Sequence, residues 1–178
     1  GAAVEPTQGD GPSRACTCAL AAALVEMVRA VSLRQQPVDP RAIEERRARA
    51  KALRHVVLAL ADTDAAAYQT VLAVQRQRGE AGHALRLREA LHAATDPLLA
   101  LVEAAGEVTR LAADATGQAR GGVRGEAKTA AVLGAAVVEA GAPLIELNLA
   151  GAPQDPRVLL VRDIADAARS DRVRALNV

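Results

Sequence analysis

The chain has 178 residues, a mass of 18.4 kDa and a net charge of +1, and 51% of its residues are hydrophobic while 24% are charged. This balance is typical of a single globular domain and excludes a disordered chain. About a quarter of the residues are alanine, the best helix former, and only 1% are aromatic. We therefore expect one all-α domain over residues 1–178 and no large β-sheet.

The first half of the chain predicts a loop and two helices. Glycine and proline punctuate residues 1–13, and Ser13 can cap a helix over residues 14–34. Asp39 and Pro40 then form a strong start signal for a second helix that runs to about residue 78. The apolar stripe of the first helix, which we expect to face the core, consists of Cys16, Leu20, Ala23, Leu24, Met27 and Val31.

The second half predicts shorter helices between breaks. A helix over residues 81–94 is expected to restart or kink at residues 95–97 and to continue to about residue 115. A glycine-rich loop over 117–125 precedes a helix over 126–140, which Gly141 and Pro143 should interrupt before a short apolar segment at 144–149. A turn at 153–156 leads to a last helix over 157–175. The expected architecture is an antiparallel bundle of about five to seven helices, with residues 151–178 forming its C-terminal helix.

The charge balance, the apolar runs and the cysteines limit the partners and the cell compartment that we expect. The 22 basic and 21 acidic residues leave no excess for phosphates, so we expect no nucleic acid partner. No run of about 18 apolar residues is free of charge, so we expect no membrane helix. Cys16 and Cys18 would point about 200° apart on a helix, which suits neither a disulfide nor a redox pair and indicates a cytoplasmic protein.

Asp64 is the first candidate for chemistry. It occupies a position where the helix pattern demands an apolar side chain, between Leu60 and Tyr68, whereas Asp62 points elsewhere. A buried carboxylate needs a partner or its pKa rises, which makes Asp64 a candidate acid/base or ligand anchor. The alternative is a structural carboxylate matched by one of the many arginines.

Two short histidine motifs are candidate metal-ligand pairs. Glu89 and His92 have the spacing used by di-iron bundles, and Glu80 and His83 repeat it nine residues earlier. Both pairs fall on one predicted helix, and nine residues turn them to opposite sides. We therefore expect no metal site.

Two glycine-containing segments precede predicted helix starts. They are Gly9-Asp10-Gly11 and residues 117–125. Free N–H groups at a helix start favour an anion or a polar ligand. Simple chain flexibility is the more common meaning of such glycines.

The order of these features resembles the formiminotransferase-cyclodeaminase family, which includes methenyltetrahydrofolate cyclohydrolases. The similarity covers about residues 6–150 and starts with a glycine loop followed by an alanine-rich helix that ends near Val25-Glu26-Met27. The run 60–68 is similar to the family's second helix, and Thr95-Asp96-Pro97-Leu98 to its helix restart. The resemblance implies an all-helical fold, a homodimer, and a folate-processing site under the glycine loop.

Several polar positions depart from the family pattern. The three-glycine-and-serine loop reads Gly9-Asp10-Gly11-Pro12, and the lysine that ends the second helix is absent at 77–79. A serine–aspartate pair reads Gly125-Glu126. Of two asparagines near 144–148, only Asn148 remains. The shared positions are mostly those of helix packing, which indicates a kept fold with lost or replaced folate chemistry.

Three functions follow from these observations. The first is a repurposed enzyme that closes or opens a ring at an imine, iminium or activated carbonyl of a small molecule. The second is a folate cyclodeaminase or methenyltetrahydrofolate cyclohydrolase, with reduced folate as a substrate, and the third is a non-catalytic dimeric binding or partner protein. We expect Asp64 and Glu126 to be catalytic and no cofactor to be required. Substrate contacts are expected from Gly9, Asp10, Gly11, Lys128 and Asn148.

Overall fold

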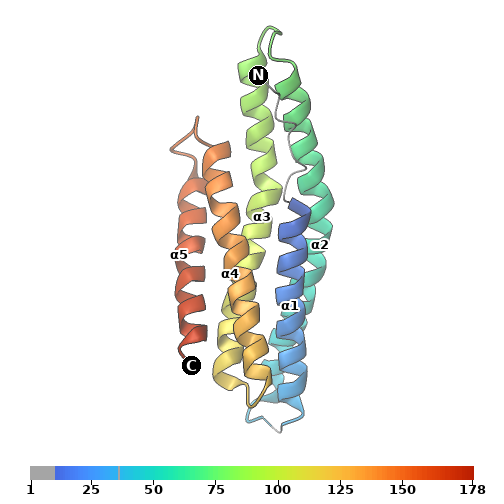
Figure 1. Ribbon diagram of the computed structural model, residues 1–178, viewed down its shortest axis with the longest axis vertical. Helices are drawn as coiled ribbons and strands as arrows, with labels where there is room; N and C mark the ends of the chain where they lie inside the picture. The colour runs from blue at the N-terminus through green and yellow to red at the C-terminus, as the bar shows by residue number, and fades with distance from the viewer. Residues whose placement is uncertain (1–10, 36) are drawn as a thin grey trace.

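The computed structural model describes residues 11–35 and 37–178, and these form five α-helices without any strand (Figure 1). The expected all-α bundle is confirmed, and the number of helices lies within the expected range. The helices are α1 (Gly11–Leu33), α2 (Pro40–Arg76), α3 (His83–Gln118), α4 (Val123–Asn148) and α5 (Pro156–Leu176).

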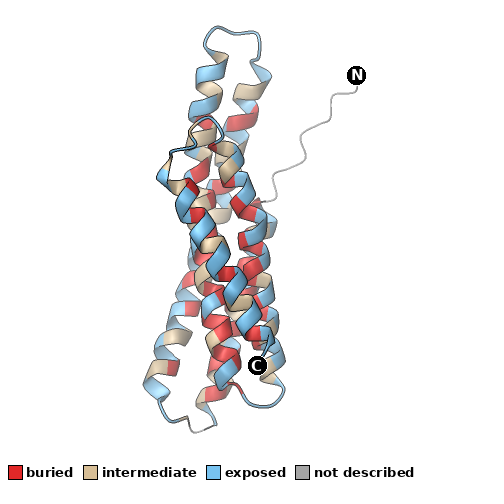
Figure 2. Ribbon diagram, turned by 90° about the vertical axis from the view of Figure 1, so that its left-hand side faces the viewer, coloured by how far each residue is buried: buried red, intermediate tan, exposed pale blue. Residues whose placement is uncertain are grey.

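The helices run alternately up and down and differ in length. α1 packs against α2, α3 and α4, whereas α5 lies outside this group against α3 and α4. The hairpin of α2 and α3 extends beyond the other helices at the top of Figure 1, because α1 begins only part of the way down the bundle. Figure 2 shows the buried residues along the inner helix faces and few of them at the end of that hairpin.

The start signal of α2 acts as the sequence predicts, and the structure shows a second one at α5. The Asp39 side chain accepts a hydrogen bond from the backbone N–H of Ala42 at 3.0 Å, and a proline follows it at the first helical position. The same arrangement opens α5, where Asp155 accepts from the N–H of Arg157 at 3.0 Å. Both caps satisfy an N–H that would otherwise lack a partner within the helix.

The first helix starts earlier than expected, and the glycine-rich loop is shorter. α1 already includes Gly11, so Ser13 lies inside the helix and is not its cap. Between α3 and α4 only residues 119–122 lie outside the helices, instead of the expected 117–125. In this tight turn Gly121 has a φ of 64°, a conformation that other residues rarely adopt.

Pro97 does not restart a helix, because α3 continues through it. A proline leaves a carbonyl of the preceding turn without its usual donor. In the same turn, the Thr95 hydroxyl donates to the Leu91 carbonyl at 3.0 Å. From α5, the Arg157 guanidinium donates to the His92 carbonyl at 3.3 Å. The predicted restart at Pro97 was therefore wrong, since α3 is one helix.

The expected break at Gly141 and Pro143 is also wrong, since α4 is one helix. A β-carbon at Gly141 would lie 2.5 Å from Cγ2 of Val102 on α3, and one at Gly134 would lie 2.5 Å from Oγ1 of Thr109. The glycines therefore allow α4 to approach α3 closely. Pro143 lies on the exposed side of α4, where water can serve the carbonyl that it leaves unpaired.

The face that α1 turns to the core differs from the prediction. The buried residues include Ala15, Cys18, Val25 and Val28, whereas the predicted core residue Leu20 is 54% exposed. Cys16 and Met27 of the predicted stripe are exposed as well, and both cysteines are free thiols. The helix is apolar on nearly all sides, so periodicity alone could not select the side that faces α3.

Three helices also have the length and apolar composition of a membrane span. These are α1, α2 and α4, and in the apolar windows concerned 44%, 17% and 50% of the residues are buried inside the bundle. Each helix still contains charged residues, such as Arg29 in α1 and Glu139 in α4. The expectation that the chain binds no membrane remains a prediction.

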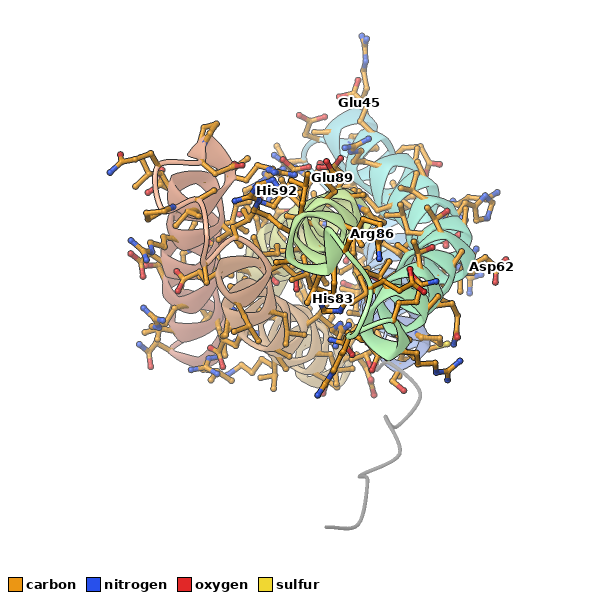
Figure 3. All side chains as sticks on the ribbon, turned by 90° about the horizontal axis from the view of Figure 1, so that it is seen from above. Glu45, Asp62, His83, Arg86, Glu89 and His92 are labelled. Carbon is orange, nitrogen blue, oxygen red and sulfur yellow. The ribbon has the colours of Figure 1, made fainter. Side chains whose placement is uncertain are left out.

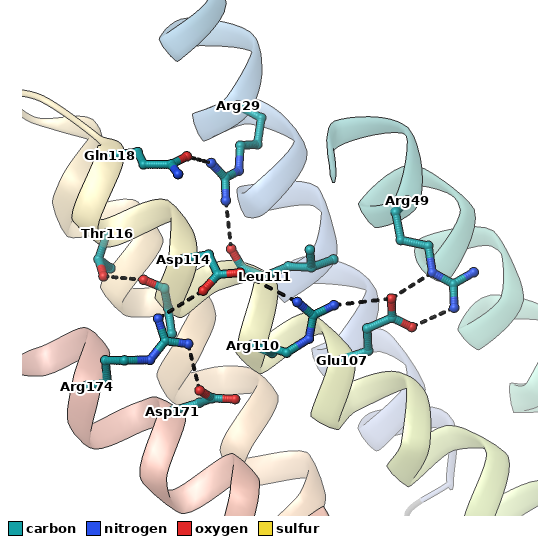
Figure 4. A network of polar contacts seen from close by, with 11 residues as sticks. Arg29, Arg49, Glu107, Arg110, Leu111, Asp114, Thr116, Gln118, Asp171 and Arg174 are labelled. Carbon is teal, nitrogen blue, oxygen red and sulfur yellow. Dashed lines mark hydrogen bonds and ion pairs between the residues drawn. The ribbon is translucent and has the colours of Figure 1, made fainter. Parts of the chain in front are cut away.

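A chain of ion pairs ties α2, α3 and α5 together on the outside of the bundle (Figure 4). Arg49 of α2 forms a two-pronged pair with Glu107 of α3, with an Nη2–Oε2 distance of 2.5 Å. Arg110 joins Glu107 to Asp114 along α3. Asp114 then pairs with Arg174 of α5 at 2.9 Å. Two-pronged arginine pairs and networks hold their geometry better than isolated surface pairs do.

Candidate functional site

Asp64 lies on the inner side of α2, as the sequence predicts. Its relative exposure is 9%, and Val57 and Val71 on the same stripe are buried. Asp62 is exposed, and Figure 3 shows it on the outer side of α2. Tyr68, one turn further along α2, is half-buried. The local sequence thus placed one carboxylate of the pair toward the bundle and the other toward solvent.

Gly11, at the start of α1, lies directly against Asp64. A β-carbon at Gly11 would overlap Oδ2 of the Asp64 carboxylate and lie 2.9 Å from its Cγ. Any larger residue at position 11 would therefore have to displace the carboxylate. The sequence predicted Gly11 as a substrate contact and Asp64 as a catalytic group, and the structure brings the two together.

Arg14, three residues into α1, forms an ion pair with Asp64. The Nη2–Oδ2 distance is 3.8 Å, the side chains are 13% and 12% exposed, and Nε of Arg14 is buried without a hydrogen bond. Burial raises the pKa of the Asp64 carboxyl above its ordinary value, and the Arg14 charge opposes part of that rise. This long contact leaves room for a further partner.

The start of α1 adds a favourable field for a negative charge at Asp64. The first N–H groups of a helix have no partner within it, and the helix dipole is positive at that end. A carboxyl with a raised pKa beside such donors can accept a proton and return it. The arrangement of Gly11, Arg14 and Asp64 can therefore hold a polar or anionic group and exchange a proton with it.

Asn148 ends α4 at the level of this site. α1 and α4 pack side by side and have their other ends at the same end of the bundle (Figure 1). At 1.5 Å per residue, Gly11 lies about 33 Å and Asn148 about 38 Å from that end. Asn148 is half-buried. Gly9 and Asp10, two other predicted contacts, lie outside the described residues.

Glu126 and Lys128 lie at the opposite end of the bundle. Both belong to the beginning of α4, and one cavity is lined by residues around that beginning and around the beginning of α2. Asp64 is 24 residues into α2, about 36 Å from that end. Within one chain, Glu126 cannot share a cleft with Asp64. Lys128 Nζ instead donates to the Leu176 carbonyl at 3.2 Å and caps the end of α5.

The two histidine motifs lie on different sides of α3. Figure 3 shows His83 on one side of the helix and His92 with Glu89 on the other. Glu80 pairs with Arg86 at 3.0 Å. Among the described residues no three histidine, cysteine, aspartate or glutamate side chains lie close enough to hold one metal ion.

Arg29 is a functional candidate that sequence reasoning missed. It is a fully buried arginine on α1 whose guanidinium donates to the Gln118 side chain and, at 3.3 Å, to the Leu111 carbonyl (Figure 4). Burial and the charge of Arg46 lower its pKa to about 10, and Asp114 opposes this shift. The signal was present in the sequence, because Arg29 interrupts a helix that is apolar on nearly all sides.

The comparisons agree with this architecture. The chain is similar to the crystal structure of formiminotetrahydrofolate cyclodeaminase from Thermotoga maritima, with a TM-score of 0.78, 17% identity, and coverage of 97% of this chain and 88% of that one. At this identity the likeness shows the fold. A search of curated proteins found no match. The family model of formiminotransferase-cyclodeaminase matches residues 2–163, which is most of the chain. The chain therefore belongs to the formiminotransferase-cyclodeaminase family.

Proposed function

We propose that this protein is an enzyme of the cyclodeaminase type that closes or opens a ring at an imine, iminium or activated carbonyl carbon of a small molecule. The observation that supports this proposal is the buried Asp64 carboxyl, whose pKa is raised and which lies against the start of α1 and 3.8 Å from Arg14. A buried carboxyl with a raised pKa suits proton transfer.

In ring closure, an amine nitrogen attacks the carbon of a protonated amidine and forms a new C–N bond. The tetrahedral intermediate then holds an ammonium proton on the attacking nitrogen and a neutral amino group. Asp64 accepts that proton and delivers it to the amino group. The second C–N bond breaks, ammonia departs, and a cyclic amidinium with one positive charge remains. Neither an oxidant nor a resident cofactor is needed, because only protons and one C–N bond are exchanged.

A direct test uses two aspartates on the same helix. Asp64→Asn removes the proposed proton carrier, whereas Asp62→Asn makes the same change on the exposed side of α2. Substrates are 5-formiminotetrahydrofolate, 5,10-methenyltetrahydrofolate and a panel of cyclic and open amidines without a pterin. We expect ammonia release or ring hydrolysis with a member of the panel that lacks a pterin, lost in Asp64→Asn and kept in Asp62→Asn. Turnover that survives in Asp64→Asn would contradict the proposal.

Reduced folate as the natural substrate is the second candidate, favoured by the family membership and the fold. Against it stand the lost serine, lysine and first asparagine of the family pattern. Each lost polar contact should cost about 1–3 kcal/mol of binding free energy. We therefore expect weak binding and no accelerated hydrolysis of 5,10-methenyltetrahydrofolate. Rapid loss of its chromophore on adding protein would establish the folate reaction instead.

A non-catalytic binding protein is the third candidate. Such a protein would show saturable binding of a compound from the same panel but would convert none of them. Asp64→Asn would then change the affinity, and neither chain would show turnover. The steady-state measurement above separates this outcome from the other two.

We further propose that the protein is a homodimer that uses a surface we term the α1–α4 face. Its outward residues carry no charge, and they are Cys16, Leu20, Ala23 and Met27 on α1 and Val132, Ala136, Ala140, Leu144 and Leu147 on α4. The two helices pack against each other in the bundle. A helix that is apolar on all sides is stable in water only when its outer face is covered. The small alanines of this face allow close approach of a second copy.

A further inference from the structure

A cavity of about 550 Å³ lies at the end of the bundle remote from Asp64. Its walls come from the turn between α1 and α2 and the turn between α3 and α4. This volume falls in the range of small-molecule sites in proteins. The cavity is therefore large enough for a ligand with several functional groups.

Three arginines line this cavity, and they are Arg46, Arg120 and Arg124. Among the described residues, Arg46 and Arg120 have no side-chain hydrogen bond or ion pair, whereas Nε and Nη2 of Arg124 both donate to the Ala119 carbonyl at 3.2 Å. The single acidic residue in the lining is Asp39, and one of its oxygens already caps α2. The lining thus carries an excess of positive charge.

A fourth guanidinium lies behind the wall. Arg29 is fully buried, and it donates to Gln118, which lines the cavity. Nε of Arg29 is buried without a partner, and the charge of Arg46 is close enough to lower the pKa of Arg29. Like charges held this near one another repel, and a bound anion would relieve the repulsion.

The beginning of α4 adds no negative charge to the cavity. Glu126 in its first turn is exposed and does not line the cavity. The positive end of the helix dipole lies beside the arginines, because Arg124 of the first turn is one of them.

We propose that this cavity, which we term the arginine cavity, binds a small molecule carrying two or more oxyanion groups, either phosphates or carboxylates, at a site separate from Asp64. Arg46 and Arg120 supply the free guanidinium forks, and Arg124 is held at the wall by its own backbone contact. Forked N–H donors match the paired oxygens of phosphate and carboxylate. The proposal does not depend on the reaction proposed for Asp64.

The test measures binding of pyrophosphate, citrate and inorganic phosphate by calorimetry at constant ionic strength, with thermal unfolding as a second readout. We expect saturable binding of one pyrophosphate or citrate per chain, weaker binding of phosphate, and a higher unfolding temperature with the bound ligand. Pyrophosphate compared with citrate tells whether phosphates or carboxylates are preferred. Arg46→Gln and Arg120→Gln should each weaken binding about tenfold, since each loses a charge-assisted contact.

Arg34→Gln is the matched control. Arg34 is exposed at the same end of the bundle but does not line the cavity, so this substitution removes the same charge outside the site. We expect its affinity to stay within about twofold of the original, because screening weakens the effect of a charge outside the site. An equal loss in Arg34→Gln, or the absence of saturable binding, would overturn the proposal. Asp64→Asn should bind normally, and a loss there would show that the two sites are not separate.

Discussion

The α-carbon of Gly11 lies so close to the carboxylate of Asp64 that a single added methyl group would overlap Oδ2. These two residues are more than 50 positions apart in the chain, and the contact joins the start of α1 to the middle of α2. The contact places the carboxyl at the positive end of the α1 dipole.

Gly11→Ala should displace Asp64 and lower the melting temperature, because the new methyl group and the carboxylate cannot occupy the same space. Gly117→Ala is the control, since no atom lies within 4 Å of its added β-carbon and α3 includes this position. Alanine is a better helix former than glycine, so this control should gain roughly 0.5–1 kcal/mol of stability. Equal melting temperatures for Gly11→Ala and the original chain would show that the two groups are not in contact.

The pH dependence of stability should distinguish Asp64 from an ordinary surface aspartate. Its pKa is raised in the folded state, so the folded chain holds this proton more tightly than the unfolded chain does. The stability that the protonated carboxyl contributes is present below the unfolded value near 3.8 and is lost as the pH rises through the folded value. Relative to Asp64→Asn, the original chain should therefore lose stability over this interval and then level off.

Urea unfolding of both chains between pH 3 and pH 8 measures this difference. Asp62→Asn should follow the original chain closely, because Asp62 is exposed. If Asp64→Asn were clearly less stable than the original chain at pH 7, the Arg14 contact would be a structural ion pair, and Asp64 would lose its role as the leading acid/base candidate.

Arg29 should also be essential for the stability of the fold. Arg29→Ala opens a cavity in the core and leaves the Leu111 carbonyl and the Gln118 side chain without their donor. We expect a loss of about 2–5 kcal/mol in the free energy of unfolding. Arg34→Ala, an exposed change one turn beyond the buried part of α1, should stay within about 0.5 kcal/mol of the original chain. A loss below 1 kcal/mol in Arg29→Ala would contradict this account.

The α1–α4 face can be tested through the molar mass in solution. Light scattering should give twice 18.4 kDa for the original chain and 18.4 kDa for Leu20→Glu, because a buried charge at the interface is costly. Leu159→Glu on α5, at a position with 66% exposure compared with 54% for Leu20, should remain dimeric. If the original chain has the molar mass of a monomer and co-floats with lipid vesicles, a membrane covers this face and the dimer proposal is wrong.

Local sequence determined the helix starts and the inward aspartate. Asp39 caps its helix as predicted, because a cap depends on a few neighbouring residues and on the backbone between them. Asp64 lies inward because the periodicity of α2 separates a mixed helix into two faces, and Asp62 consequently lies outward. The family resemblance likewise rested on the order and spacing of helix-packing residues, and the family model confirms it.

Tertiary contacts decided the remaining features. Pro97 and Gly141 are helix-breaking signals in isolation, yet α3 and α4 continue through them, and Val102 of α3 packs closely against Gly141. The face of α1 could not be assigned, because a helix that is apolar on nearly all sides has no preferred direction until its neighbours are placed.

The composition of the sites also depended on the placement of whole helices. Glu126 has the chemistry of an acid/base group, but the length of α2 puts about 36 Å between Asp64 and the end of the bundle where Glu126 lies. Arg46 and Arg120 come from segments more than 70 residues apart, and only the meeting of two turns makes them walls of one cavity. Sequence by itself thus determined which residues could bind or react, because side-chain chemistry and helical periodicity are local. The packing of the helices decided which of those residues meet, because distances between helices depend on contacts that are remote along the chain.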